Sequence, residues 1–260
     1  MKKISKKIVR LFASAAVLVS IAVNSYANGI EDSILSEYLE DEVFSSIYYS
    51  ENRPLAEKII NDVSVRRSEE MSSPRTVVGP SAYYTVPIIK QETSIYCGFA
   101  SMHQILSALS LNSKIKGTTN LEKQTTLKNE MNEIMKSQGL EPSQTGVVAY
   151  MALVLNNYLS QKLYYWYDVN NDFEDIYDFQ RYTYDSLAND CPTIMRTNTS
   201  SLSYYNGTNY SHYIVVDYID LDKSLIETAD CCWTDAYRGH FMVPIEEAYN
   251  ASSYIICISH

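Results

Sequence analysis

The chain lacks several features that define large classes of proteins. Its 260 residues contain no internal repeat, no cysteine and histidine spacing typical of a zinc site, and no second long apolar run. We therefore expect neither a repeat architecture nor a multispanning membrane protein, and we expect no metal ion or other cofactor. Cysteine is also scarce. The chain has five, and an odd number leaves at least one thiol outside any internal pairing.

Residues 1–27 have the features of a secretory signal peptide. Five basic residues precede an apolar stretch at 11–23, and Ser-Tyr-Ala at 25–27 supplies a small-x-small cleavage site. The apolar stretch is shorter than the roughly 20 residues that a membrane-spanning helix needs. The sequence thus predicts a secreted, extracellular protein, with an uncleaved membrane anchor as the alternative.

Positive charge is scarce in the rest of the chain. Residues 1–27 carry five basic and no acidic residues, so their removal takes the formal net charge from −10 to −15. A surface of that sign repels phosphate groups. We therefore expect no nucleic-acid partner, and no membrane partner after signal cleavage.

The most informative stretch is residues 91–106, where a turn runs into an amphipathic helix. Cys97 lies at the expected start of that helix, with Ser94 or Thr93 as the expected N-cap. Unpaired N–H groups and the positive end of the helix dipole favour the thiolate at that position. Gln91 carries an amide that can donate to an oxyanion beside the sulfur. This arrangement is typical of a nucleophilic cysteine.

A predicted β-hairpin supplies a histidine and a carboxylate. Residues 212–219 and 224–230 alternate as strands, and the residues between them have turn composition. Pairing about Leu221 joins residues whose numbers sum to 442, which places His212 opposite Asp230 and within hydrogen-bond reach. A slip of one residue would turn Asp230 to the other face, and Asp217 and Asp235 are competing acids nearby.

Together these residues resemble the papain-like cysteine peptidases, specifically the bacterial branch similar to bacteriocin (double-glycine) leader peptidases. The shared motif is Gln, five residues and Cys-Gly-x-Ala-Ser at a helix start, followed later by a His-Tyr strand. The resemblance covers about two thirds of the chain, from Tyr84 onward. It implies that Cys97 is the nucleophile and Gln91 the oxyanion donor. It also implies that His212 is the base and that Asp230 is the acid that orients the His212 ring.

The resemblance also implies an α+β, papain-like fold at residues 83–260. A helical subdomain that carries Cys97 should pack on an antiparallel β-sheet that carries His212 and Asp230. Two positions depart from the family pattern, because Phe99 and Cys231 stand where proline is common. From local patterns we expect strands at 83–89, 162–169 and 192–196, and helices at 120–136, from Ser143 or Thr145 to 159, and at 178–188.

Residues 28–82 form a separate N-terminal extension. Apolar residues recur at helical spacing at 30–39 and 55–63, and a polar, proline-containing stretch at 66–75 has the composition of an exposed linker. A helical extension on a cleavable linker suggests an autoinhibitory propeptide that blocks the active-site cleft. The alternative is a permanent helical segment packed on the domain.

The predicted reaction is hydrolysis of peptide (amide) bonds in a peptide or protein substrate. Two alternatives remain open. The same triad can transfer an acyl group to an amine or cleave a cell-wall peptide, or the chain is a catalytically inactive papain-like module for binding or adhesion. An intact set of Cys97, His212 and Asp230 favours an enzyme, because an inactive module would be free to lose any of them.

The other cysteines and the abundant tyrosines each allow two interpretations. Adjacent cysteines form a strained bridge, so two pairing schemes remain for four residues, which are Cys191, Cys231, Cys232 and Cys257. The alternative is that all four are reduced and buried. The 23 tyrosines include Tyr164-Tyr165 and Tyr204-Tyr205, which either line a substrate groove or pack on half-exposed sheets.

Overall fold

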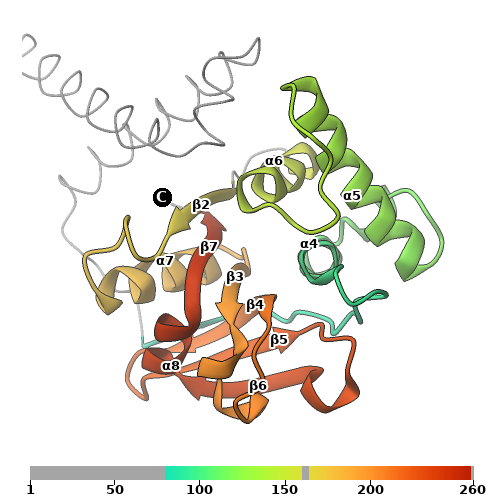
Figure 1. Cartoon of the computed structure of the whole chain (residues 1–260). Helices are drawn as coiled ribbons and strands as arrows, with labels where there is room; N and C mark the ends of the chain where they lie inside the picture. Colours follow the sequence, from blue (N-terminus) through green and yellow to red (C-terminus); the bar gives the residue numbers. More distant parts are fainter. Residues whose placement is uncertain (1–79, 160–163, 259–260) are drawn as a thin grey trace, which may run out of the picture. The chain divides into compact units, whose positions relative to one another are not determined.

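The computed structural model describes residues 80–159 and 164–258, which belong to one compact unit, Val77–His260 (Figure 1). The predicted signal peptide and nearly all of the 28–82 extension lie outside the described residues, so both stay predictions. Within the described part of the chain, no helix combines the length and the hydropathy needed to cross a membrane.

A seven-stranded antiparallel sheet forms the centre of this unit. The strand order is β2-β7-β3-β4-β5-β6, and β1 pairs with β4 outside this path. The two strands of the predicted hairpin therefore lie side by side within the sheet. The strands are β1 Ser81–Tyr83, β2 Tyr164–Asp168, β3 Thr193–Asn198, β4 Ser211–Asp220, β5 Leu225–Asp230, β6 Gly239–Pro244 and β7 Ser252–Ile258.

Three helices form a helical subdomain beside the sheet, as Figure 1 shows. In this subdomain α4 contacts β4, α5 and α6. The structure thus has the expected α+β architecture, with the cysteine helix packed on an antiparallel sheet. The α-helices are α4 Cys97–Ala108, α5 Asn120–Ser137, α6 Val148–Tyr158, α7 Ile176–Ala188 and α8 Ile245–Ala251, and 3-10 turns lie at Asn112–Lys114, Thr199–Ser201, Ser203–Tyr205 and Asp235–Tyr237.

The helix that carries Cys97 is buried along most of its length. Its first ten residues are all buried. A Cβ added at Gly98 would lie 3.0 Å from Met151 Sδ and 3.1 Å from the Gly146 Cα, which is closer than nine in ten Cβ contacts. Glycine at 98 therefore lets the start of α4 approach the chain that leads into α6. This close packing holds the Cys97 backbone in place.

Helix α5 follows the sequence signals closely. Thr119 accepts a hydrogen bond from the Glu122 N–H, and the Glu122 carboxylate accepts from the Thr119 N–H, which makes a capping box. Gly139, just after the C-terminal end, has a left-handed φ of +77°. The observed limits agree with the predicted helix at 120–136 and its glycine stop.

Helix α6 begins at Val148, later than the predicted start at Ser143 or Thr145, so that prediction is wrong. The Ser143 hydroxyl donates to the Thr145 carbonyl, and the Ser143 N–H donates to the Asn132 side chain on α5. These polar groups tie a loop to α5, and no side chain caps α6. Its buried apolar residues nevertheless pack against α4, as predicted.

The predicted strand at 83–89 is also wrong, because β1 ends at Tyr83. The Tyr84 N–H still donates to the Asp217 carbonyl at 2.7 Å, and the chain then leaves the sheet. Pro87 has no N–H for a strand ladder, and its carbonyl accepts from the Gln104 side chain on α4. The segment thus crosses from the sheet to α4.

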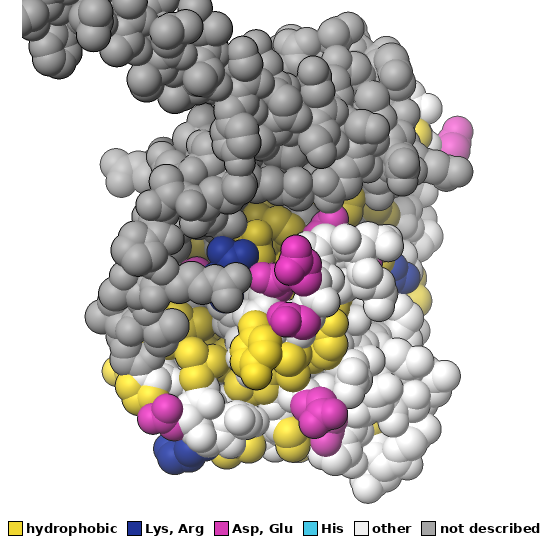
Figure 2. Space-filling model, turned by 90° about the vertical axis from the view of Figure 1, so that its left-hand side faces the viewer, with side chains coloured by type: hydrophobic (Ala, Val, Ile, Leu, Met, Phe, Trp, Pro, Cys, Tyr) yellow, Lys and Arg dark blue, Asp and Glu magenta, His cyan; other side chains and the backbone are white. Residues whose placement is uncertain are grey.

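Figure 2 shows one face of the unit, on which acidic side chains lie among apolar ones and basic side chains are few. This distribution agrees with the formal net charge of −10.

Candidate active site

Cys97 is the first residue of α4, as the sequence predicts. The N-cap residue is Tyr96, with no side-chain cap, so the expected cap by Ser94 or Thr93 is wrong. The Thr93 carbonyl instead accepts from the Tyr96 N–H. No side-chain cap therefore shields the start of the helix, where the dipole stabilises a thiolate.

His212 and Asp230 meet between β4 and β5, although not in the predicted register. Val216 pairs with Thr228, so the residue numbers sum to 444, and a bulge beyond Val216 shifts the sum to 445. Continued toward the strand ends, this register makes His212 the diagonal neighbour of Asp230. A diagonal pair is still within side-chain reach. His212 Nε2 lies 2.9 Å from Asp230 Oδ1, and both side chains are buried.

Four donors hold the Asp230 carboxylate. Oδ1 accepts from His212 Nε2 and, at 2.8 Å, from the backbone N–H of Cys232. Oδ2 accepts from the hydroxyls of Tyr204 and Tyr205, at 3.0 and 2.8 Å. The orientation of this acid, and with it that of the imidazole, is therefore fixed by neighbours on both oxygens.

The two tyrosines are site residues that the sequence analysis missed. They lie in the 3-10 turn Ser203–Tyr205, far from β5 in sequence. The Tyr-Tyr pair was the available signal, but it was interpreted as groove or sheet surface. Tyr205, Tyr164 and Tyr165 are all buried, so these three line no surface groove.

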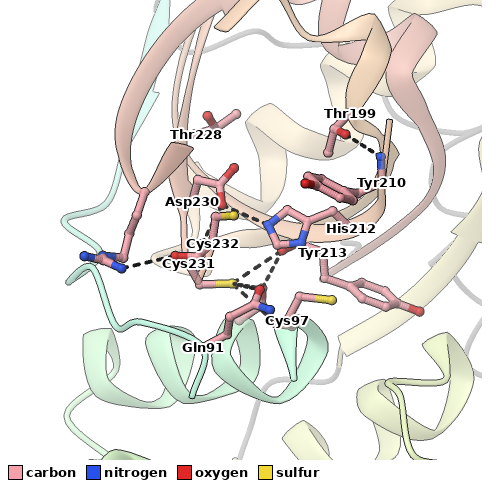
Figure 3. A network of polar contacts seen from close by, with 12 residues as sticks. Gln91, Cys97, Thr199, Tyr210, His212, Tyr213, Thr228, Asp230, Cys231 and Cys232 are labelled. Atoms are coloured by element: carbon pink, nitrogen blue, oxygen red, sulfur yellow. Dashed lines mark hydrogen bonds and ion pairs between the residues drawn. The ribbon is translucent and has the colours of Figure 1, made fainter. Parts of the chain in front are cut away.

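The imidazole of His212 is charged more readily than an ordinary histidine. Burial alone would lower its pKa, but the charge and hydrogen bond of Asp230, with the Cys231 and Cys97 thiols, raise the pKa well above its usual value. Because Nε2 faces Asp230, the other edge of the ring is the one that faces the thiols. Figure 3 shows His212 between Asp230 and the start of α4.

The pKa of the Cys97 thiol shifts in the opposite direction. Burial alone would raise its pKa, but the hydrogen bond and charge of His212 and the N–H groups of Tyr213 and Gly98 outweigh that effect. The pKa of Cys97 is therefore lowered from its ordinary 9.0. A lowered thiol pKa beside a raised imidazole pKa favours proton transfer from sulfur to nitrogen.

Gln91 lies in the same pocket and is almost fully buried. Its backbone N–H donates to the Cys231 carbonyl at 2.8 Å, and its side-chain amide donates to the Thr93 carbonyl at 2.8 Å. A primary amide has two N–H bonds. One of them is held by Thr93, which fixes the amide beside Cys97 (Figure 3) and leaves the second for another acceptor.

A second thiol, Cys231, lies beside the first. Its Sγ is 3.6 Å from the Cys97 carbonyl oxygen and 4.0 Å from Gln91 Oε1. Burial raises its pKa to about 11, although the nearby His212 opposes that shift. Two neighbouring cysteines thus differ in chemistry, since Cys97 favours the thiolate and Cys231 the neutral thiol.

The remaining candidates lie outside this pocket. Cys231 and Cys232 are free, buried thiols, and both disulfide schemes require them, so neither scheme is present. His103 bonds to Asn112, and burial lowers its pKa. Asp235 pairs with Arg238, and Asp217 pairs with His240, so neither competing acid reaches His212.

Within the pocket, His212, Asp230 and Cys231 present ligand atoms within 4.8 Å of one another, a set that a metal ion could use.

Comparisons with known proteins identify the family of this chain. A search of curated proteins found no match. A solved double-glycine motif protease from an AMS/PCAT transporter, in complex with the leader peptide, is similar at 14% identity and a TM-score of 0.42. That match covers 68% of this chain and 93% of the other. The family model described as "Peptidase_C39 like family" matches residues 83–255, so this chain belongs to that cysteine peptidase-type family.

Proposed function

We propose that the protein is a cysteine peptidase that hydrolyses peptide bonds with Cys97, His212, Asp230 and Gln91. One observation carries the proposal: a buried imidazole, 2.9 Å from a carboxylate, lowers the pKa of a thiol at a helix start. This is the arrangement that generates a thiolate and imidazolium pair. The hydrogen bonds to Asp230 support the role of that acid in orienting His212.

In the first half-reaction the Cys97 sulfur attacks the carbonyl carbon of the scissile bond. A C–S bond forms and the carbonyl π electrons move to oxygen. The free N–H of the Gln91 amide and the backbone N–H of Cys97 donate to that oxyanion. The His212 imidazolium then gives its proton to the leaving nitrogen, the C–N bond breaks, and an amine departs from a thioester.

In the second half-reaction water attacks the thioester carbon while His212 accepts a proton from it. The C–S bond breaks, the product leaves with a new carboxyl group, and the pair at Cys97 and His212 is restored. Asp230 stays charged throughout and holds the imidazole in place. No cofactor takes part in these steps.

We propose a peptide or protein substrate, and two exposed aromatic side chains support this. Trp233 is 50% exposed and follows Cys232, whose N–H donates to Asp230. Tyr210 is 42% exposed and packs edge-on against Tyr205. Exposed aromatic side chains close in sequence to His212 and Asp230 provide an apolar surface for substrate side chains. The structurally similar protease is itself in complex with a leader peptide.

Export and autoinhibition complete the proposal and rest on the sequence. The basic and apolar pattern of residues 1–27 supports secretion, and the polar linker at 66–75 supports cleavage between the 28–82 extension and the domain. The compact unit that contains the site begins at Val77.

The test is digestion of a peptide library in water enriched in ¹⁸O, followed by mass spectrometry. Chains that begin at residue 28 and at residue 77 are compared, each beside its Cys97→Ala variant. Hydrolysis adds one ¹⁸O atom to each new carboxyl group, and the variant should produce none. Products joined to an added amine without ¹⁸O would indicate acyl transfer instead. No products from either chain, with the fold intact, would contradict peptidase activity.

A further inference from the structure

A second cluster of metal-ligating side chains lies outside the candidate active site. Asp217 on β4, Glu227 on β5 and His240 on β6 each bring one ligand atom within 4.8 Å of the others. Side chains alternate between the two faces of a strand, so Glu227 points to the opposite face from Asp230, three residues later. The two sites thus lie on opposite faces of the same strands.

The sheet register explains how three strands contribute to one cluster. His240 pairs with Ala229, and Glu227, two residues from Ala229, lies on the same face. Asp217 falls at the bulge between the pairs formed by Val216 and Tyr218, so it is the extra residue of β4. Strands β4 and β6 lie two strand spacings apart, about 10 Å. The small side chain of Ala229 between them leaves room for the imidazole and the Asp217 carboxylate to meet.

The distances within the cluster suit a coordinated cation. His240 Nδ1 lies 3.1 Å from Asp217 Oδ2 and 3.8 Å from Glu227 Oε2. Ligands at 2.0–2.2 Å from a tetrahedral zinc ion lie about 3.4 Å from one another. Both distances from His240 Nδ1 therefore lie within about 0.4 Å of that ligand spacing.

An unsatisfied buried atom points independently to a missing ligand. Asp217 is only 3% exposed, and its Oδ1 has no hydrogen-bond partner. A buried carboxylate oxygen without a partner is costly in free energy, and a cation would satisfy it.

We propose that Asp217, Glu227 and His240 bind a divalent transition-metal ion such as Zn²⁺. One imidazole nitrogen and two carboxylates are ligands that such ions accept, and their two negative charges balance the ion. The side chains of Glu227 and His240 are 33% and 38% exposed, so an ion and its water molecules reach the cluster from solvent. The ion would link β4, β5 and β6, and thereby brace the strands that carry His212 and Asp230.

The test is calorimetric titration of the untagged, metal-free full chain with Zn²⁺ alone. We expect one ion per chain. Binding should weaken at least tenfold in His240→Ala and in Glu227→Gln, and stay unchanged in the matched control Glu246→Gln, which alters an exposed acid on α8. It should persist in Cys231→Ala, which removes a ligand from the other cluster, formed by His212, Asp230 and Cys231.

Cobalt spectroscopy gives a second measurement, which identifies the ligand atoms directly. Co²⁺ held by nitrogen and oxygen should show ligand-field bands without a sulfur-to-cobalt charge-transfer band. Three results would overturn the proposal: no Zn²⁺ binding, binding unchanged in His240→Ala, or a sulfur band that vanishes in Cys231→Ala.

Discussion

Two histidine–aspartate pairs lie on opposite faces of the sheet, one between β4 and β5 and the other between β4 and β6, and their comparison shows what decides the chemistry of such a pair. His212 Nε2 is 2.9 Å from Asp230, and His240 Nδ1 is 3.1 Å from Asp217. The distances are similar. The surroundings differ, because Asp230 accepts four hydrogen bonds, whereas one oxygen of Asp217 accepts none.

This difference indicates opposite uses for similar groups. A carboxylate with both oxygens satisfied holds an imidazole in one orientation, which suits proton transfer to and from a thiol. A carboxylate with a free oxygen beside a second acid still needs positive charge, which suits a cation. The two sites therefore differ in the other contacts of each carboxylate and not in the histidine–aspartate pair itself.

The largest expected effect is the loss of activity when His212 is replaced. His212→Ala should lower kcat/KM for a cleaved peptide by on the order of 10⁴ or more, because the base and the counter-ion of the thiolate are lost together. His260→Ala, at the C-terminal residue, is the matched histidine control and should stay within about twofold. Steady-state kinetics measure both, and a loss below tenfold in His212→Ala would contradict the assignment.

The next effect is the pH dependence that Asp217 gives to the free energy of unfolding when a chelator has removed any metal. The pKa of Asp217 is raised from 3.8 to about 8, so the folded state binds a proton that the unfolded state has released above pH 4. Stability from this group is thus present at low pH and lost as pH rises from about 4 to about 8, by roughly 1.4 kcal/mol per pKa unit. Urea unfolding at pH 5, 7 and 9 should show this loss in the wild type and a flatter profile in Asp217→Asn. Parallel profiles would be evidence against it.

A smaller effect appears when metal is added to the same site. Zn²⁺ at one hundred times its dissociation constant should raise the free energy of unfolding by about 2.7 kcal/mol. The gain should disappear in Glu227→Gln and remain in Glu246→Gln. Urea unfolding with and without Zn²⁺ measures it, and equal gains in the two variants would place the ion elsewhere.

The smallest effect tests the hydrogen bonds that distinguish Asp230. Tyr205→Phe removes the 2.8 Å donor to Oδ2, which should destabilise the fold by about 2 kcal/mol and lower kcat roughly tenfold with little change in KM. Tyr177→Phe, an exposed tyrosine on α7, serves as the control. If even Tyr204→Phe combined with Tyr205→Phe leaves kcat unchanged, the tyrosines do not position the acid.

Local sequence signals predicted the fold where the physics is local. The limits of α5 and the start of α4 at Cys97 depend on neighbouring residues, and both appear as expected. The predicted helix start at Ser143 and the predicted strand at 83–89 were wrong because polar groups there bond to distant parts of the fold. The Ser143 N–H bonds to α5, and the Pro87 carbonyl bonds to α4. No local pattern specifies such contacts.

The candidate site shows the same limit. The sequence singled out residues that the structure brings together, namely Cys97, Gln91, His212 and Asp230, although their catalytic roles stay predictions. The predicted register was wrong because the hairpin turns between Asp222 and Lys223 rather than at Leu221, which sets the sum of paired residue numbers at 445, and the bulge at Asp217 then changes it to 444. The bulge also places Asp217 in the second cluster. Strand alternation does not reveal the bulge, so the sequence indicated Asp217 only as a competitor of Asp230.

The measurement that tests the central claim most directly is the rate of Cys97 alkylation by an epoxide inhibitor as a function of pH. The wild type should react with a midpoint below 9.0, the ordinary pKa of the thiol, and Cys231, with a pKa of about 11, should stay unlabelled near neutral pH. In His212→Ala only the N–H groups of Tyr213 and Gly98 still oppose the burial effect, so the midpoint should rise. Identical profiles in the two proteins would contradict an activated pair of Cys97 and His212.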